Sequence, residues 1–161
     1  MVPSFHPPLG YELRERLHAG NMSEVYAGLR MSDGLPVVLK VYPPVANAQQ
    51  DAAREHQILE LLAGDGTPRP LQLHTEAGRP VLAMERIAGL RLSEWAATTL
   101  TPLDGVLDVA ISLAEILTRV HAARWIHRDI NPANVLVTPE TRRVHLIDFA
   151  LARPLGAAER T

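Results

Sequence analysis

The chain has 161 residues, of which 47% are hydrophobic, and a net charge of −2 from 16 basic and 18 acidic residues. This length and composition predict one folded domain with a core and exclude a disordered chain. The balanced charge argues against nucleic acid or an anionic membrane as partner. The lack of cysteine excludes a disulfide framework and a thiolate metal site. No apolar run approaches the roughly 18 residues of a membrane helix, and no secretory signal begins the chain, so we expect a cytoplasmic protein.

The first half of the chain is predicted to form strands around one inserted helix. Residues 1–10 are proline-rich, which predicts a loose lead-in. A helix is expected over Asp51–Ala63, ending at Gly64, a residue type that is common just beyond helix C-termini. Alternating apolar residues and turn residues predict strands at residues 11–17, 25–30, 36–41, 71–75 and 80–85.

The second half is predicted to be mainly helical. Ser93 is expected to cap a short helix, and Thr101 and Pro102 have the residue types that often begin a longer one. This longer helix carries an apolar stripe at Val106, Ala110, Leu113, Leu117 and Val120. A strand pair should follow at residues 135–138 and 144–147. The boundary between two lobes is expected near Glu85–Gly89, and clefts between lobes often bind small molecules.

Lys40 is a charged residue within the apolar strand PVVLKV. A buried charge is costly unless it has a partner. One interpretation is an edge-strand lysine whose ammonium reaches water. The other is a phosphate-binding lysine paired with Glu55 on the inserted helix. The residues alone leave both interpretations open.

A second group of polar residues lies in WIHRDINPANVLV and in the following strand pair. Asp129 can accept a proton from an attacking hydroxyl, and Asn134 and Asp148 offer the oxygen ligands that Mg²⁺ takes beside phosphates. The alternative is that Asp129 and Asn134 stabilise turns and that Asp148 is a polar strand end. None of the seven histidines stands at the spacing of a metal site.

Together these motifs make the sequence resemble the eukaryotic-type protein kinase family. LHAGNMSEVY, VVLK, REHQIL, HRDINPAN and DFA follow one another in the family's order, from about Tyr11 to Arg153. The resemblance implies an α+β, protein kinase-like fold over residues 11–161. Its N-terminal β-rich lobe would be complete, at about residues 11–85, and its helical C-terminal lobe partial, at about 90–161. IHRDINPANVLV and LIDFALA most resemble the kinase-like head of bacterial multidomain signalling histidine kinases.

The resemblance also implies the cofactors ATP and Mg²⁺ and a role for each matched residue. Lys40 matches the lysine that holds the α- and β-phosphates, Glu55 its ion partner and Asp129 the catalytic base. Asn134 and Asp148 match the two magnesium ligands. The remaining positions match those that contact the nucleotide: Leu17, Gly20, Val25, Val38, Met84, Glu85, Ile87 and Leu136.

Four positions depart from the family's pattern. His18 and Ser23 stand in place of two loop glycines, which predicts weaker phosphate contact. Asn131 replaces a catalytic lysine that touches the transferring phosphate, so transition-state stabilisation should be weaker. Ala150 replaces the glycine of the Asp-Phe-Gly turn.

The chain ends at Thr161, before the family's activation segment and final helical block, so we interpret it as a fragment of a longer signalling chain. We therefore expect the apolar stripe on the Pro102–Ala122 helix to be partly uncovered. The leading interpretation is an ATP-dependent serine/threonine protein kinase domain with an unknown protein substrate. The alternative is a nucleotide-binding pseudokinase or regulatory module. The HRD-type loop disfavours a third class, the small-molecule phosphotransferases.

Overall fold

The computed structural model describes residues 5–62, 64–98 and 103–156, which form two compact units. The first unit comprises the chain up to Gln57 and Arg69–Arg86. The second comprises Ile58–Pro68 and the chain from Ile87 onward. Expectations for Ala63, Thr101 and Pro102 lie outside the described residues.

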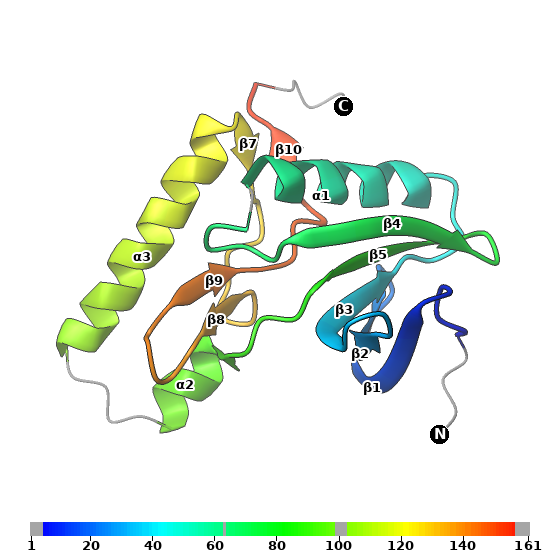
Figure 1. The fold of residues 1–161 in the computed structure, drawn as a ribbon. Coiled ribbons are helices and arrows are strands. Elements are labelled where there is room, and N and C mark those ends of the chain that lie inside the picture. The colour runs from blue at the N-terminus through cyan, green and yellow to red at the C-terminus, as the bar shows by residue number, and fades with distance from the viewer. Residues whose placement is uncertain (1–4, 63, 99–102, 157–161) are drawn as a thin grey trace. The chain divides into compact units, whose positions relative to one another are not determined.

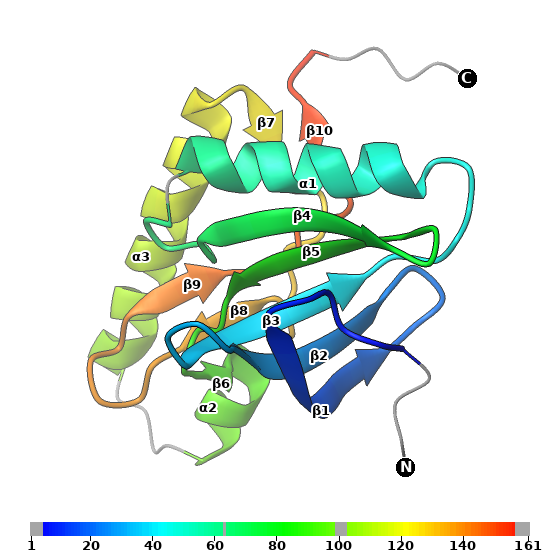
Figure 2. The same cartoon turned by 45° about the vertical axis from the view of Figure 1, so that its right-hand side comes forward.

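The first unit is built on a five-stranded antiparallel sheet with the strand order β1-β2-β3-β5-β4. Its strands are β1 (Tyr11–Ala19), β2 (Glu24–Arg30), β3 (Leu35–Val41), β4 (Pro70–Glu76) and β5 (Arg79–Glu85). Helix α1 (Ala48–Leu62) begins in this unit and lies along β4 in both views (Figures 1 and 2). All five predicted strands are confirmed, with bounds shifted by a few residues.

Turn chemistry fixes the sheet's hairpins. The Asp33 carboxylate accepts hydrogen bonds from Arg30 at 3.0 Å and from the Leu35 amide at 3.2 Å, while Gly34 takes a φ of 71°. Ala77 and Gly78 both have positive φ, as the tightest hairpin turns require. These local signals explain why the strands of this unit could be located from the sequence.

One face of the sheet carries the core of the first unit. Val37, Leu39 and Val41 are fully buried on the same face of β3, as the predicted pleat requires. Phe5 is also buried in this core and stacks on Tyr26 with ring centroids 5.9 Å apart. The expectation of a loose lead-in was therefore wrong for Phe5, because its aromatic ring covers apolar side chains of the sheet.

The second unit combines two helices with short strands. They are β6 (Leu90–Arg91), α2 (Leu92–Thr98), α3 (Leu103–Ala122), β7 (Trp125–Ile126), β8 (Val135–Val137), β9 (Val144–Leu146) and β10 (Arg153–Pro154). One small sheet has the order β6-β8-β9, and β10 pairs with β7. Ser93 does not cap α2. Helix α2 begins at Leu92, one residue before Ser93, and the Glu94 carboxylate accepts a hydrogen bond of 3.0 Å from the Arg91 amide.

Helix α3 buries one side and exposes another. Its buried residues are Gly105, Val109, Ile116 and Val120. Val106, predicted to belong to the apolar stripe, is exposed together with Leu103, Leu107 and Ile111. The predicted stripe is thus partly uncovered at Val106, as expected, although the buried side of α3 is displaced by about one position from the stripe.

Gly66 brings the loop after α1 close to α3 within the second unit. A Cβ atom on Gly66 would lie 2.5 Å from Cγ1 of Ile116, and its φ of +73° favours glycine. The Gly66 carbonyl also accepts a hydrogen bond of 2.8 Å from the Leu146 amide of β9.

Within the described residues, no helix combines the length and apolar character needed to cross a membrane.

Candidate active site

Lys40 and Glu55 form a buried ion pair in the first unit. The Lys40 Nζ lies 2.9 Å from Oε1 and 2.7 Å from Oε2 of Glu55, and the two residues are 4% and 1% exposed. Strand β3 lies between β2 and β5, so Lys40 is not on an edge strand. The interpretation of a lysine that reaches water at a sheet edge is therefore wrong. Removing one partner of such a pair typically costs about 3–5 kcal/mol of stability.

The residue type at position 40 is itself a sequence signal. Lys40 is the only lysine in the chain, and the other 15 of its 16 basic residues are arginines. Lysine and arginine serve equally well on many exposed surfaces, but a compact ammonium differs from a planar guanidinium at a buried site. The one position at which the sequence uses lysine is thus a buried ion pair.

Several predicted nucleotide-contacting residues share one face of the first unit's sheet. Val25 pairs directly with Lys40, and Val38 pairs with Met84. Residues opposite each other in adjacent strands project to the same face, as do Val38 and Lys40 two positions apart. This face is opposite to that of Val37, Leu39 and Val41.

The predicted phosphate loop is a tight connection between β1 and β2. The Gly20 amide donates a hydrogen bond of 3.0 Å to the Ser23 carbonyl. A Cβ on Gly20 would lie 2.6 Å from Nε2 of His18, so the His18 imidazole lies against this glycine. Leu17 is partly exposed on β1, Glu85 ends β5, and the remaining two predicted contacts, Ile87 and Leu136, belong to the second unit.

Asp129 lies in the loop between β7 and β8, where two amide side chains hold its carboxylate. Asn134 Nδ2 donates to Asp129 Oδ2 at 2.8 Å, and Asn131 Nδ2 donates to Oδ1 at 3.1 Å. The same two amides also donate to the Asp129 carbonyl, at 3.0 and 3.3 Å. Asn131 Oδ1 in turn accepts from the Ala133 amide at 2.9 Å. The loop thus has the expected turn-stabilising contacts and also an oriented carboxylate.

His127 anchors the start of this loop. It is fully buried, and its ring packs edge-to-face on Phe149 with centroids 4.6 Å apart. The Asp129 amide donates to Nδ1 at 3.2 Å, which assigns the proton to Nε2, 3.1 Å from the Ile147 carbonyl. The intervening Arg128 has a φ of 71°. A positive φ at a residue other than glycine is unfavourable, and such residues occur in turns and also cluster at functional sites.

Asn134 and Asp148 leave the same end of the β8–β9 hairpin. The Ile147 amide donates to the Asn134 carbonyl at 2.9 Å, one pair beyond Val135 and Leu146. Asp148 follows, exposed and with a φ of 64°. Since the Asn134 amide nitrogen is bonded to Asp129, its oxygen is the acceptor that remains.

An amide oxygen and an exposed carboxylate fit Mg²⁺. The described residues contain no group of three histidine, cysteine, aspartate or glutamate side chains that could hold a metal. Mg²⁺ usually keeps several water ligands and is held by one or two protein oxygens together with substrate phosphates, so these two residues suit it.

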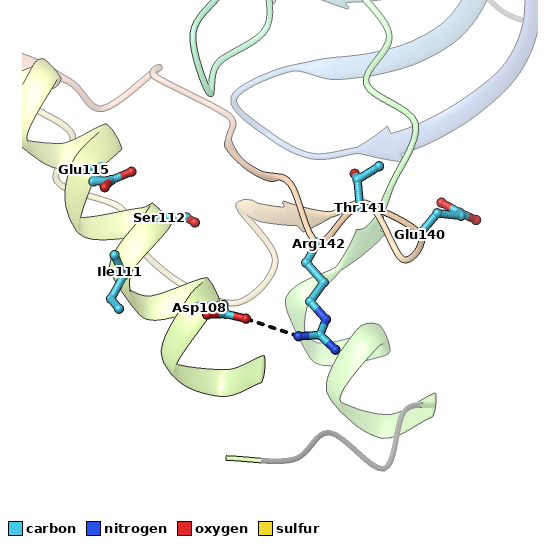
Figure 3. Close-up of a pocket in the computed structure, with 7 residues that line it drawn as sticks. All are labelled: Asp108, Ile111, Ser112, Glu115, Glu140, Thr141 and Arg142. Carbon is cyan, nitrogen blue, oxygen red and sulfur yellow. Dashed lines mark hydrogen bonds and ion pairs between the residues drawn. The ribbon is translucent and has the colours of Figure 1, made fainter. Parts of the chain in front are cut away.

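A separate open hollow of about 610 Å³ lies on the second unit, between α3 and the β8–β9 turn (Figure 3). Arg142 crosses it and binds Asp108 at 3.1 Å. Its other lining residues are Ile111, Ser112, Glu115, Glu140 and Thr141. None of the predicted site residues lines it, and its polar, acidic lining does not suit a nucleotide.

The sequence of residues 11–161 matches the family model of the protein kinase domain. The chain therefore belongs to the protein kinase domain family, and the expected α+β kinase-like fold is confirmed.

Named relatives agree with this membership. The probable serine/threonine-protein kinase PkwA of Thermomonospora curvata is 35% identical over 94% of this chain and 21% of its own length. Casein kinase I homolog 2 of Saccharomyces cerevisiae is 28% identical over 90% of this chain and 28% of its own. Serine/threonine-protein kinase pkn2 of Myxococcus xanthus is 31% identical over 85% of this chain and 17% of its own length. The chain thus spans less than a third of each relative, and none of these three is named a histidine kinase.

Proposed function

We propose that this chain is an ATP-dependent protein kinase domain that transfers a phosphoryl group from Mg-ATP to a serine or threonine hydroxyl of a protein. The observation that carries the proposal is the buried Lys40–Glu55 pair, since two charges are removed from water at positions that match the family's phosphate-binding lysine and its partner. The serine/threonine kinase relatives support the acceptor type.

Under this proposal, one group of residues binds the nucleotide and another binds Mg²⁺. Lys40 would hold the α- and β-phosphates, and the Gly20 loop would cover them. The adenine would be bound by the apolar side chains and the backbone positions matched above: Leu17, Val25, Val38, Met84, Glu85, Ile87 and Leu136. Asn134 and Asp148 would hold Mg²⁺, which neutralises charge on the phosphates when it is bound.

Asp129 would accept the proton of the acceptor hydroxyl. Its two oxygens are already oriented by Asn131 and Asn134, so little reorganisation is needed before the proton moves. Phosphoryl transfer relies mainly on positioning and charge stabilisation. Asn131 cannot supply the positive charge of a lysine, so turnover should be slow.

The pseudokinase alternative is favoured by two residues. Asn131 brings no positive charge to the position of the family's catalytic lysine, and the His18 ring lies against Gly20 in the phosphate loop. In a pseudokinase, the chain would bind the nucleotide and relay its presence without transferring phosphate.

Asp129→Asn separates the two functions. For a kinase, this change should abolish transfer from labelled ATP to a protein acceptor, by at least about a hundredfold, and leave ATP affinity within about twofold. Glu140→Gln, an exposed acid outside the proposed site, serves as the matched control. If unchanged chain and Asp129→Asn bind ATP equally and neither transfers phosphate, the pseudokinase function is correct.

We further propose that the domain works within a longer signalling chain in the cytoplasm, as in the kinase-like heads that its HRDINPAN loop resembles. The much greater length of the relatives supports the proposal that the domain belongs to a longer chain. A chain without cysteine suits a reducing compartment. Its protein substrate would be bound by parts of such a longer chain.

A further inference from the structure

Tyr42 lies two residues beyond Lys40 and directly follows β3. Its backbone amide donates to the Pro80 carbonyl at 2.9 Å, and its own carbonyl accepts from Arg79 Nε at 3.1 Å. The residue is 3% exposed, and Pro43 follows it. Because both backbone groups are bonded to residues at the start of β5, the backbone of Tyr42 is fixed against the sheet.

The Tyr42 hydroxyl joins the buried ion pair. It donates to Glu55 Oε2, the oxygen that lies 2.7 Å from Lys40 Nζ. The Lys40 ammonium also lies 5.6 Å from the centroid of the Tyr42 ring, within the range of a cation–π contact. Lys40, Tyr42 and Glu55 are thus joined in one buried network.

The third member matters because Lys40 has two tasks under the proposed function. When its ammonium contacts phosphate oxygens, fewer of its three N–H donors remain for Glu55. A carboxylate that is 1% exposed cannot turn to water for a replacement. Tyr42 offers a neutral donor that does not compete for the phosphates.

We propose that Tyr42 is a positioning residue for the kinase reaction: its hydroxyl holds Glu55 in place, so that Lys40 keeps its orientation while it binds phosphate. This role rests on the proposed function. In this proposal Tyr42 acts through Glu55 and Lys40, not by binding the nucleotide or the acceptor.

The test compares Tyr42→Phe with Tyr26→Phe. Tyr26 is a matched control, because it is a buried tyrosine of the same sheet whose hydroxyl donates to a carboxylate, Glu24, at 2.5 Å. We expect Tyr42→Phe to weaken Mg-ATP binding about tenfold, the lower range for a hydrogen bond to a charged group, and Tyr26→Phe to leave it unchanged. Equal affinities in the two variants, with equal losses of thermal stability, would show a merely structural hydroxyl and overturn the proposal.

Two further measurements complete the test. Labelling with ¹⁵N-lysine gives one side-chain signal, because Lys40 is the only lysine. Tyr42→Phe should shift this signal and speed its proton exchange, and Tyr26→Phe should not. An unchanged signal in Tyr42→Phe overturns the proposal without any need for ATP. In a Glu55→Gln background, Tyr42→Phe should have little further effect on ATP affinity, and a full additional loss would mean that Tyr42 does not act through Glu55.

Lys40→Ala separates this proposal from the proposed function. If Lys40→Ala binds ATP as the unchanged chain does, or if neither binds, the kinase function fails. The lysine signal still decides whether Tyr42 orders the network. If Lys40→Ala loses binding and Tyr42→Phe does not, the kinase function stands and the role of Tyr42 fails.

Discussion

Under the proposed function, Asp129 combines a structural and a chemical role in one residue. Asn131 and Asn134 each donate to one of its carboxylate oxygens and also to its backbone carbonyl. From the sequence, turn stabilisation and catalysis were alternatives, yet under the proposed function the same hydrogen bonds serve both. What the sequence could not reveal is the direction of the Asn131 amide, because that depends on the fold of the loop.

Asn131→Ala tests this contact at the residue scale. Loss of the hydrogen bond from Asn131 to the Asp129 carboxylate should lower the rate of phosphoryl transfer about tenfold. Mg-ATP affinity should stay within about twofold, since the family position that Asn131 matches acts on the phosphate during its transfer. Turnover with labelled ATP and calorimetric titration measure the two quantities. An equal loss in both would show that Asn131 binds the nucleotide or supports the whole loop.

At the scale of the elements, strands with strong local signals were predictable and tertiary contacts were not. The strands of the first unit follow from apolar alternation and from turn residues such as Asp33 and Gly34. The burial of Phe5 and the exact buried side of α3 depend on what covers an apolar face, which local sequence does not specify. The Tyr42–Glu55 contact joins the end of a strand to a helix and likewise has no local signal.

Two strand histidines predict a pH dependence of stability. Burial holds the pKa of His74 on β4 and of His145 on β9 below the ordinary value of 6.5, and for His145 the nearby Arg143 adds to the effect. The unfolded chain then binds protons more readily than the folded chain. Stability should therefore be complete above about pH 6.5 and fall as the pH drops below it toward the folded-state values.

The measurement is urea unfolding at about pH 7.5 and pH 5.5. His145→Gln should reduce the loss on acidification, because its side chain has no proton to gain. His121→Gln, an exposed histidine of α3 for which no such burial applies, is the control. If His145→Gln loses as much stability as the unchanged chain, His145 does not contribute to the pH dependence.

At the scale of the whole molecule, the exposed apolar residues of α3 predict association. Leu103, Val106, Leu107 and Ile111 are exposed on this helix, and contiguous apolar surface promotes contact between chains. Leu107→Ser with Ile111→Ser should therefore reduce binding of a hydrophobic dye and shift sedimentation toward the monomer. If the unchanged chain is monomeric and binds no dye, the prediction is wrong.

The family and fold were predictable for the whole molecule because the motifs occur in one fixed order over nearly the full sequence. The roles of individual residues within that order remain proposals, since they depend on a bound nucleotide. The central claim is that Lys40 and Asp148 take part in binding Mg-ATP. Calorimetric titration with Mg-ATP tests it most directly. The variants are Lys40→Ala and Asp148→Ala, with Asp108→Ala as the control acid from the separate hollow.

We expect saturable binding by the unchanged chain that requires Mg²⁺. This binding should be weakened at least about tenfold in Lys40→Ala and Asp148→Ala and unchanged in Asp108→Ala. Absence of binding by a chain shown to be folded, or equal binding by all the variants, would contradict the central claim.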